Sequence, residues 1–238
     1  DIAFKKIFGD QRHADITISF LNAVLELSGK DVIVKVEILD PINHPENEKL
    51  KTSIVDVHCI DGRGSHYIVE MQIVDKKNFA ERCQYYTALS MAHQLKPGEN
   101  YAKLKPVIFV GVVTFDVDPS PHFINHHWIL NAKTLDRVLW HMEFHFLELS
   151  KFNKTEAELE SLVDKWTFML KSAEKLEVIP PALKNSEPIT EAFGLLEQGT
   201  WSIREIEAYH RFMEAVNAEP DLKLAGFEEG REEDREEG

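Results

Sequence analysis

Apolar residues recur along the chain with two different periods, and each period predicts one kind of element. A recurrence of three and four residues is typical of helices, whereas an alternation of two is typical of strands. The helical pattern covers residues 2–8, 16–25, 79–95, 155–174, 187–198 and 202–217. An alternating or continuously apolar pattern covers residues 31–39, 53–60, 66–74, 105–115, 123–130 and 138–149. Residues 41–50 contain two prolines and are expected to form a loop.

The order of these elements predicts an α/β (or α+β) fold, in which a mixed sheet is flanked by helices. The helical pattern is continuous only after residue 153, so we expect a sheet-bearing domain over 1–153 and a helical C-terminal extension over 154–225. Thr155 with Glu158, and Ser202 with Glu205, have the spacing of capping boxes at helix starts. Residues 226–238 form an acidic low-complexity tail, which we expect to be a solvated helix end or disordered.

Composition narrows the classes of function. The formal net charge is −14, of which the tail from Phe227 to Gly238 contributes −5, and this argues against a protein that coats nucleic acid by bulk electrostatics. A metal-dependent enzyme acting on nucleic acid stays open, because divalent cations offset acidic charge at the site itself. There is no apolar window of about 18 residues and no signal-peptide core at the start, so we expect no membrane span. Cys59 and Cys83 are expected to be reduced, buried thiols of a cytoplasmic protein.

Three polar residues stand where apolar ones would be ordinary, in the stretch "IVDVHCIDGRGSHYIVEMQIV" from Ile54 to Val74. Glu70 and Gln72 share one face of their strand because they are two residues apart. If the two strands pair through the glycine-containing turn, residues whose numbers add to about 125 or 126 lie opposite each other. Asp56 then comes close to the level of Glu70.

Two interpretations of this pattern stay open. Two carboxylates that face each other repel unless something positive lies between them, and Mg²⁺ or Mn²⁺ prefers carboxylate, carbonyl and water oxygens. The carbonyl of Met71 would then be a further ligand, and Gln72 could hold a water or a phosphate oxygen. Alternatively, the three residues form a solvent-facing polar stripe on an edge hairpin.

The chain resembles the PD-(D/E)xK nuclease superfamily, and more closely its recombination-promoting nuclease and transposase branch (Rpn-like). The resemblance covers most of residues 1–153. It is carried by Asp56 and the later Glu70-Met71-Gln72, and by the segments "DIAFKKIFGD", "ISFLNAVL", "VEILDP", "SIVDVHCIDGRG", "YIVEMQI", "RCQYYTALSMAHQLKPGENYAKLKPVIFVGVVTF" and "FHFLELSKF".

The resemblance implies a restriction-endonuclease-like fold and metal-dependent hydrolysis of DNA phosphodiesters. Asp56 and Glu70 would bind Mg²⁺ or Mn²⁺. Gln72 stands where the superfamily usually has Lys, and the branch that the chain resembles also uses Gln there. Val55 stands where the motif has Pro. Because Gln is neither a base nor a cation, activation of the nucleophile would fall on the metal. Asp1 matches an acidic position in the family's first helix that approaches the metal.

Residues outside this trio are candidates for substrate contact. Arg82 and Tyr86 are four apart on the following helix and share a face, where Arg82 could hold a phosphate and Tyr86 could stack on a base. An ordinary amphipathic helix packed on the sheet explains the same spacing. Lys5 and Lys6 on the first helix are weaker candidates for a phosphate contact.

We therefore expect a Mg²⁺- or Mn²⁺-dependent DNA endonuclease of the Rpn/transposase kind, associated with DNA recombination. The alternative is a catalytically inactive DNA-binding or protein-interaction module on a nuclease scaffold. RNA in place of DNA as the substrate stays open. A homodimer would suit an enzyme that cuts both strands, although no residue indicates one.

Overall fold

Six strands form one mixed sheet in the order β1-β4-β5-β6-β8-β7. The computed structural model describes residues 2–39, 42–43, 53–75, 78–176 and 178–196. The strands of this sheet are β1 (Val36–Leu39), β4 (Val57–Asp61), β5 (His66–Gln72), β6 (Val107–Val113), β7 (Ile124–Ile129) and β8 (Leu139–Glu148). β5, β6 and β8 are parallel to one another and occupy the centre, while the outer pairs are antiparallel. The expected α/β fold with a restriction-endonuclease-like mixed sheet is confirmed.

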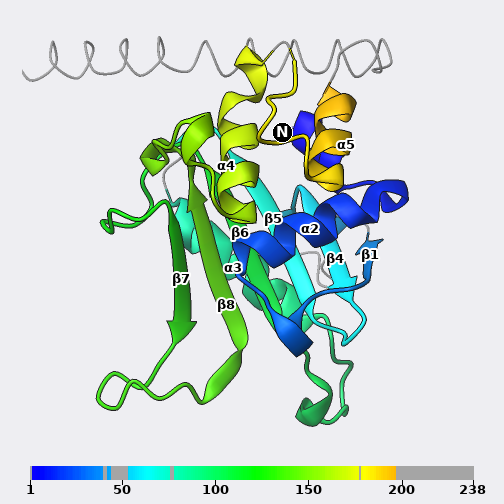
Figure 1. Ribbon diagram of the computed structural model, residues 1–238. Helices are drawn as coiled ribbons and strands as arrows, with labels where there is room; N and C mark the ends of the chain where they lie inside the picture. Colours follow the sequence, from blue (N-terminus) through cyan, green and yellow to red (C-terminus); the bar gives the residue numbers. More distant parts are fainter. Residues whose placement is uncertain (1, 40–41, 44–52, 76–77, 177, 197–238) are drawn as a thin grey trace, which may run out of the picture. The chain divides into compact units, whose positions relative to one another are not determined.

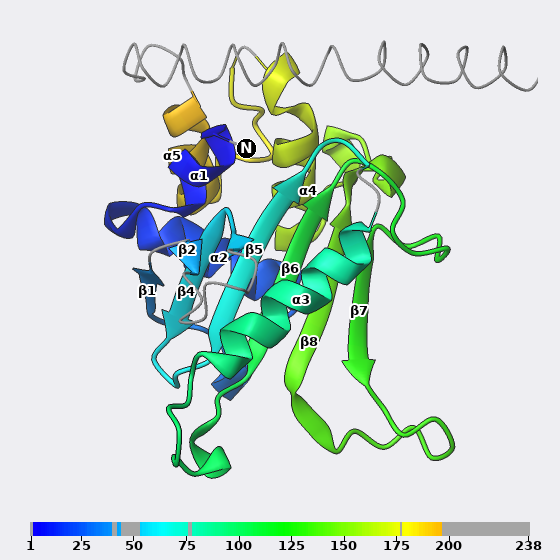
Figure 2. The same ribbon diagram turned by 180° about the vertical axis from the view of Figure 1, so that it is seen from behind.

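Helices cover both faces of the sheet. α3 (Phe79–Ala92) lies alone on one face in Figure 2, and the other helices lie on the opposite side in Figure 1. The latter are α1 (Ile2–Phe8), α2 (Ala14–Val24), α4 (Leu162–Ser172) and α5 (Glu187–Leu196). Because both faces are covered, β6 is buried at every position, which explains its continuously apolar sequence. None of these helices, within the described part of the chain, is long and apolar enough to cross a bilayer.

The β4–β5 hairpin has the register that the sequence predicts. Val57 pairs with Val69, and the ladder continues to Ile60 opposite His66. Asp61 shapes the turn, since its Oδ1 accepts hydrogen bonds from the backbone N–H groups of Arg63 and Ser65, each at 2.9 Å. Gly64 has a φ of +87°, a conformation in which a side chain would be strained.

Several elements differ from the expected ones. The strand expected over 31–39 is preceded by a short 3₁₀ helix and is regular only from Val36, while the loop expected over 41–50 contributes β2 (Ile42–Asn43), which pairs with β3 (Ser53–Ile54). The helix expected over 155–174 is divided. Thr155 and Glu158 do form a capping box, but it begins one 3₁₀ turn, and a second capping box of Ser161 and Asp164 begins α4. The short 3₁₀ helices are η1 (Gln11–His13), η2 (Gly29–Asp31), η3 (Tyr101–Lys103), η4 (Leu149–Lys151), η5 (Glu156–Glu158) and η6 (Ala173–Lys175).

Residues 3–196 pack as one compact unit. Trp166 of α4 is fully buried, and its ring centroid lies 5.7 Å from those of Phe8 and Phe20. The start of the helical extension therefore shares a core with α1 and α2, while the division of the chain at residue 153 stays a prediction. The helix expected over 202–217 and the acidic tail lie outside the described residues, as does Asp1.

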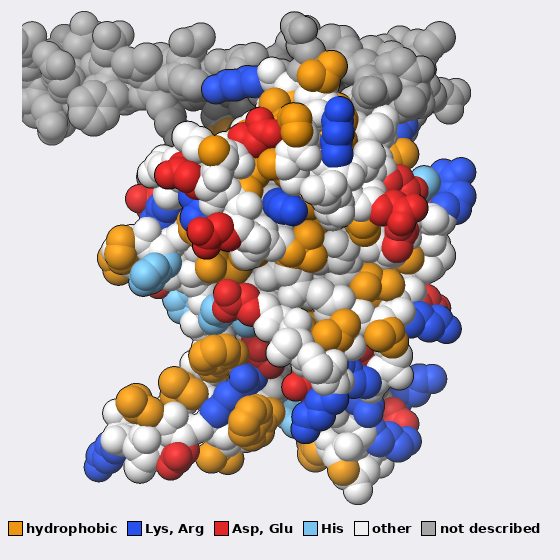
Figure 3. All heavy atoms as spheres, in the orientation of Figure 1, with side chains coloured by type: hydrophobic (Ala, Val, Ile, Leu, Met, Phe, Trp, Pro, Cys, Tyr) orange, Lys and Arg blue, Asp and Glu red, His pale blue; other side chains and the backbone are white. Residues whose placement is uncertain are grey.

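The hairpin between β7 and β8 carries an exposed apolar surface. It holds Trp128, Ile129, Leu130, Leu135, Val138, Leu139 and Trp140, at the lower left of Figure 3. Arg137 lies between the two indoles, with its guanidinium carbon 5.4 Å from the Trp128 ring centroid and 4.6 Å from that of Trp140. Cation–π attraction thus stabilises the exposed part of this hairpin.

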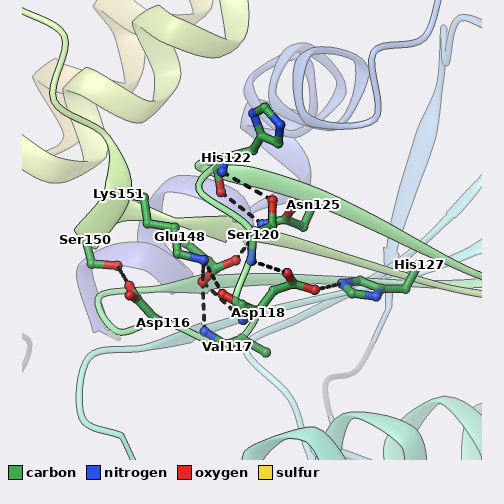
Figure 4. A network of polar contacts seen from close by, with 10 residues as sticks. All are labelled: Asp116, Val117, Asp118, Ser120, His122, Asn125, His127, Glu148, Ser150 and Lys151. Atoms are coloured by element: carbon green, nitrogen blue, oxygen red, sulfur yellow. Dashed lines mark hydrogen bonds and ion pairs between the residues drawn. The ribbon is translucent and has the colours of Figure 1, made fainter.

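The fully buried carboxylate of Glu148, at the end of β8, anchors the chain that leaves β6 (Figure 4). Its Oε2 accepts from the backbone N–H of Val117 at 2.8 Å and lies 2.6 Å from Lys151 Nζ. Its Oε1 accepts from Asn125 Nδ2 at 2.7 Å. Both oxygens are satisfied, so the interaction is structural.

We predict that Glu148→Gln lowers the free energy of unfolding by about 3 kcal/mol, because the change leaves Lys151 buried without its counter-charge and turns an amide N–H₂ toward donors. Urea unfolding followed by circular dichroism measures this loss. Glu160→Gln, the same change at an exposed position, is the control and should alter stability by less than about 0.5 kcal/mol. Equal stability of the two variants would contradict the structural role.

Candidate active site

Asp56 stands at a break between β3 and β4. Val55 packs with the cluster under α3, whereas Val57 packs with the cluster on the opposite face, although residues two apart share a face in a regular strand. The chain therefore turns at this point. Asp56 is 8% exposed, and its Oδ2 accepts a hydrogen bond of 2.8 Å from the backbone N–H of Met71. This bond fixes the Asp56 carboxylate beside the end of β5.

Glu70 is the second carboxylate of the site and is 9% exposed. Its Oε2 is buried and has no hydrogen-bond partner among the residues that the structure describes. Burial first, and then the charge of Asp56, raise the pKa of Glu70 to about 7, although Arg82 and Lys5 act in the opposite direction. A buried carboxylate oxygen without a partner is costly, so this atom is suited to receive a proton or a cation.

Two basic side chains reach the carboxylates from different helices. Lys5 Nζ of α1 lies 3.3 Å from Asp56 Oδ1, and Arg82 Nη2 of α3 lies 3.5 Å from Glu70 Oε1. Arg82 Nη2 also donates to Gln72 Oε1 at 2.5 Å. Lys5 is 40% exposed and Arg82 28% exposed, so the site has an opening to solvent.

Gln72 lies in the site, but both ends of its amide have partners. Its Oε1 receives the bond from Arg82, and its Nε2 donates to the carbonyl of Val74 at 2.8 Å. In this arrangement Gln72 orients the Arg82 guanidinium. Its role toward water or phosphate stays a prediction.

Tyr86 follows Arg82 by one helical turn and is half-buried against the cluster under α3. Burial, and then the charge of Glu70, raise the pKa of its hydroxyl. It therefore lies near the carboxylates, although stacking on a base stays a prediction. Nearby Cys83 is buried and free, and Cys59 is too, as expected.

The structure thus brings together most residues that the sequence singles out, namely Lys5, Asp56, Glu70, Met71, Gln72, Arg82 and Tyr86. Asp1 lies outside the described residues. The contact of Lys5 with Asp56 joins residues 51 positions apart in the chain, and the sequence alone gave no reason to rank Lys5 above its neighbour Lys6.

The donor set fits a hard divalent cation. No three His, Cys, Asp or Glu side chains gather as a metal site within the described ranges, so two carboxylates are the acidic ligands that this part of the chain offers. Mg²⁺ commonly uses one or two carboxylates and completes its shell with water and substrate phosphate. The unpartnered Oε2 of Glu70 beside Asp56 agrees with that mode of binding.

We predict that the metal-free protein loses stability as the pH rises, because of Glu70. Its pKa is raised from 4.5 to about 7. The stability that protonated Glu70 contributes is therefore fully present below about pH 4.5 and is lost as the pH rises through 7. At pH 8 Glu70→Gln should therefore be more stable than wild type by about 3 kcal/mol, but not at pH 4.5. Urea unfolding in EDTA at both pH values measures the difference, and parallel pH profiles of the two proteins would contradict it.

Comparison with known proteins identifies the chain through a family model. The model described as "PD-(D/E)XK nuclease family transposase" matches residues 1–221. Searches of curated proteins and of solved structures found no match. The match spans nearly the whole chain, and the mixed sheet and the paired carboxylates agree with it. The chain belongs to the PD-(D/E)XK nuclease family transposases.

Proposed function

We propose that the protein is a Mg²⁺- or Mn²⁺-dependent DNA endonuclease that hydrolyses phosphodiester bonds and acts in DNA recombination, as Rpn-like proteins do. The observation that carries this proposal is the buried pair of Asp56 and Glu70, in which Glu70 Oε2 has no partner among the described residues. Structural carboxylates of this chain, such as Glu148, have both oxygens satisfied.

Asp56 and Glu70 would hold the cation, together with the backbone carbonyl of Met71. A bound divalent cation supplies Lewis acidity toward water and phosphate oxygens. The protein's own part is to present the two carboxylates at a fixed separation. The hydrogen bond from the Met71 N–H to Asp56 supports this, because it ties one carboxylate to the strand that carries the other.

Arg82 is placed to hold the substrate. Its contacts with Glu70 and Gln72 both use Nη2, and a guanidinium carries five N–H donors in a fork that matches phosphate. Gln72 would keep this fork oriented, and Tyr86 would support it from the next helical turn. This arrangement gives Gln72 a positioning role that needs neither a base nor a charge.

Lys5 would supply the positive charge that Gln72 lacks. Its Nζ lies at the carboxylate pair, 3.3 Å from Asp56 Oδ1, and its side chain is 40% exposed. A cation beside the carboxylate pair can stabilise the charge that develops on a phosphate bound there in the transition state.

The second candidate is a catalytically inactive DNA-binding or protein-interaction module. Gln72 in place of Lys favours it, as does the net charge of −14. DNA rather than RNA as the substrate belongs to the proposal on the family's precedent. A homodimer belongs to it because two copies would suit an enzyme that cuts both strands.

We predict that the wild-type protein nicks supercoiled plasmid with Mg²⁺ or Mn²⁺, and that Asp56→Asn and Glu70→Gln each reduce the rate by at least about 10³-fold, since each removes a charged ligand. Gel electrophoresis of plasmid and of a labelled RNA of equal length measures activity and substrate choice.

Thermal unfolding of each variant shows whether the fold is kept. Nicking that survives in both variants would place the activity elsewhere. A folded wild type that cuts neither polymer with either metal would favour the inactive module.

We predict that Lys5→Gln slows nicking about 10²-fold, because it removes the cation next to Asp56. The loss of one contact that stabilises a transition state typically has an effect of about this size. Lys6→Gln carries the same change at the next position of α1 and should alter the rate less than about threefold. Single-turnover rates with excess enzyme measure the chemical step. Equal rates for the two variants would exclude a specific role for Lys5.

A further inference from the structure

A cavity of about 340 Å³ lies at the end of β5 and α3 that is remote from the carboxylates. Its lining includes His58, His66, Ser90, His93, Lys103 and Lys105. No Asp or Glu is among the residues that line it in the described part of the chain. Lys103 Nζ is paired with Glu99 Oε1 at 2.9 Å, so Lys105 is the lining lysine that has no ion pair among the described residues.

Ser90 is the polar group of this cavity that lacks a protein partner. It is 3% exposed, and its Oγ makes no hydrogen bond within the described residues. A buried hydroxyl without a hydrogen bond destabilises the protein, so a ligand that bonds to it relieves this penalty. Thr87, one turn earlier in α3, instead donates to the carbonyl of Cys83 at 2.8 Å.

The two strand histidines contact each other at the cavity. His58 Nε2 lies 3.1 Å from His66 Nδ1, and burial lowers the pKa of the His66 ring. A neutral imidazole has one N–H donor and one acceptor, so the pair can hydrogen-bond each other and still present an N–H to a ligand.

Lys105 is fixed at the cavity by its backbone and by its stem. Gln94 Oε1 accepts from the Lys105 N–H at 2.7 Å, and Gln94 Nε2 donates to the Lys105 carbonyl at 3.0 Å. The side-chain stem runs over the turn at Gly64, where a Cβ would come within 3.3 Å of Lys105 Cε. The glycine therefore serves both the turn and the passage of this lysine.

We propose that this cavity binds a phosphate group. Lysine ammonium groups, an unpaired serine hydroxyl and imidazole N–H groups are all donors, which suits an oxyanion with several acceptor oxygens.

The phosphate has two potential sources. His66 and Glu70 lie on the same face of β5, four residues or about 13 Å apart, which corresponds to about four base-pair steps of duplex DNA. A strand cut at Asp56 and Glu70 could thus place a second phosphate here, and this source rests on the proposed nuclease function. The other source is free phosphate, which is independent of that function.

Two binding measurements in EDTA, without cleavage, separate these sources. Inorganic phosphate is titrated by calorimetry, and a fluorescent 20-base-pair duplex is titrated by anisotropy over a range of salt concentrations. Wild type is compared with Lys105→Gln and Ser90→Ala. Lys96→Gln is the matched control, because Lys96 is an exposed lysine near the end of α3 that does not line the cavity.

We predict that Lys105→Gln and Ser90→Ala weaken inorganic phosphate binding at least fivefold, while Lys96→Gln changes it less than twofold. If the strand supplies the phosphate, Lys105→Gln also weakens duplex binding about 10-fold and reduces the salt slope by about 0.9. Loss of phosphate binding with unchanged duplex binding assigns the cavity to free phosphate. Wild-type and variant proteins that bind both probes equally, or no phosphate at all, would overturn the proposal whatever the nicking assay gives.

Discussion

The candidate site depends on holding two largely buried carboxylates near each other. Asp56 and Glu70 repel each other, and burial raises the pKa of Glu70 to about 7. They stay together because the β4–β5 register holds their backbones side by side. Val57 pairs with Val69, and the Met71 N–H donates a hydrogen bond to Asp56. Lys5 and Arg82 reduce the repulsion from two helices on opposite faces of the sheet. The fold and the site are therefore coupled, because the hairpin that forms part of the sheet also brings the two repelling carboxylates together.

Much of this could be predicted from the sequence because the signals are local. The alternation on either side of the glycine-containing turn sets the hairpin and its register, and hence the proximity of Asp56 to Glu70. The apolar run of β6 reports its central place, since a strand covered on both faces needs no polar side. The resemblance to the nuclease family agrees with the family model that matches residues 1–221.

What the sequence could not supply are contacts between distant segments and local competition between caps. Lys5 meets Asp56 only once α1 has packed, and nothing in the sequence separates Lys5 from Lys6. The division of the helix expected over 155–174 is decided by Ser161, whose capping box with Asp164 restarts the helix after the turn begun at Thr155. Gln72 could be placed in the site, but not its bond to Arg82, because strand and helix meet only in the fold.

The side chains at the two ends of β5 differ in charge, and we expect them to attract an anion in different ways. At the carboxylate end, Lys5 and Arg82 only balance Asp56 and Glu70, so these four side chains offer little net attraction to a phosphate until a cation is added. At the other end, Lys103 and Lys105 line a cavity. Lys103 is paired with Glu99, which leaves Lys105 as the lining lysine without an ion pair within the described residues. Because the protein as a whole is acidic, electrostatic attraction to nucleic acid has to come from a local group of basic side chains. Anchoring at the basic cavity would not need a metal, whereas engagement of the scissile phosphate would, and so the two steps can be separated in solution.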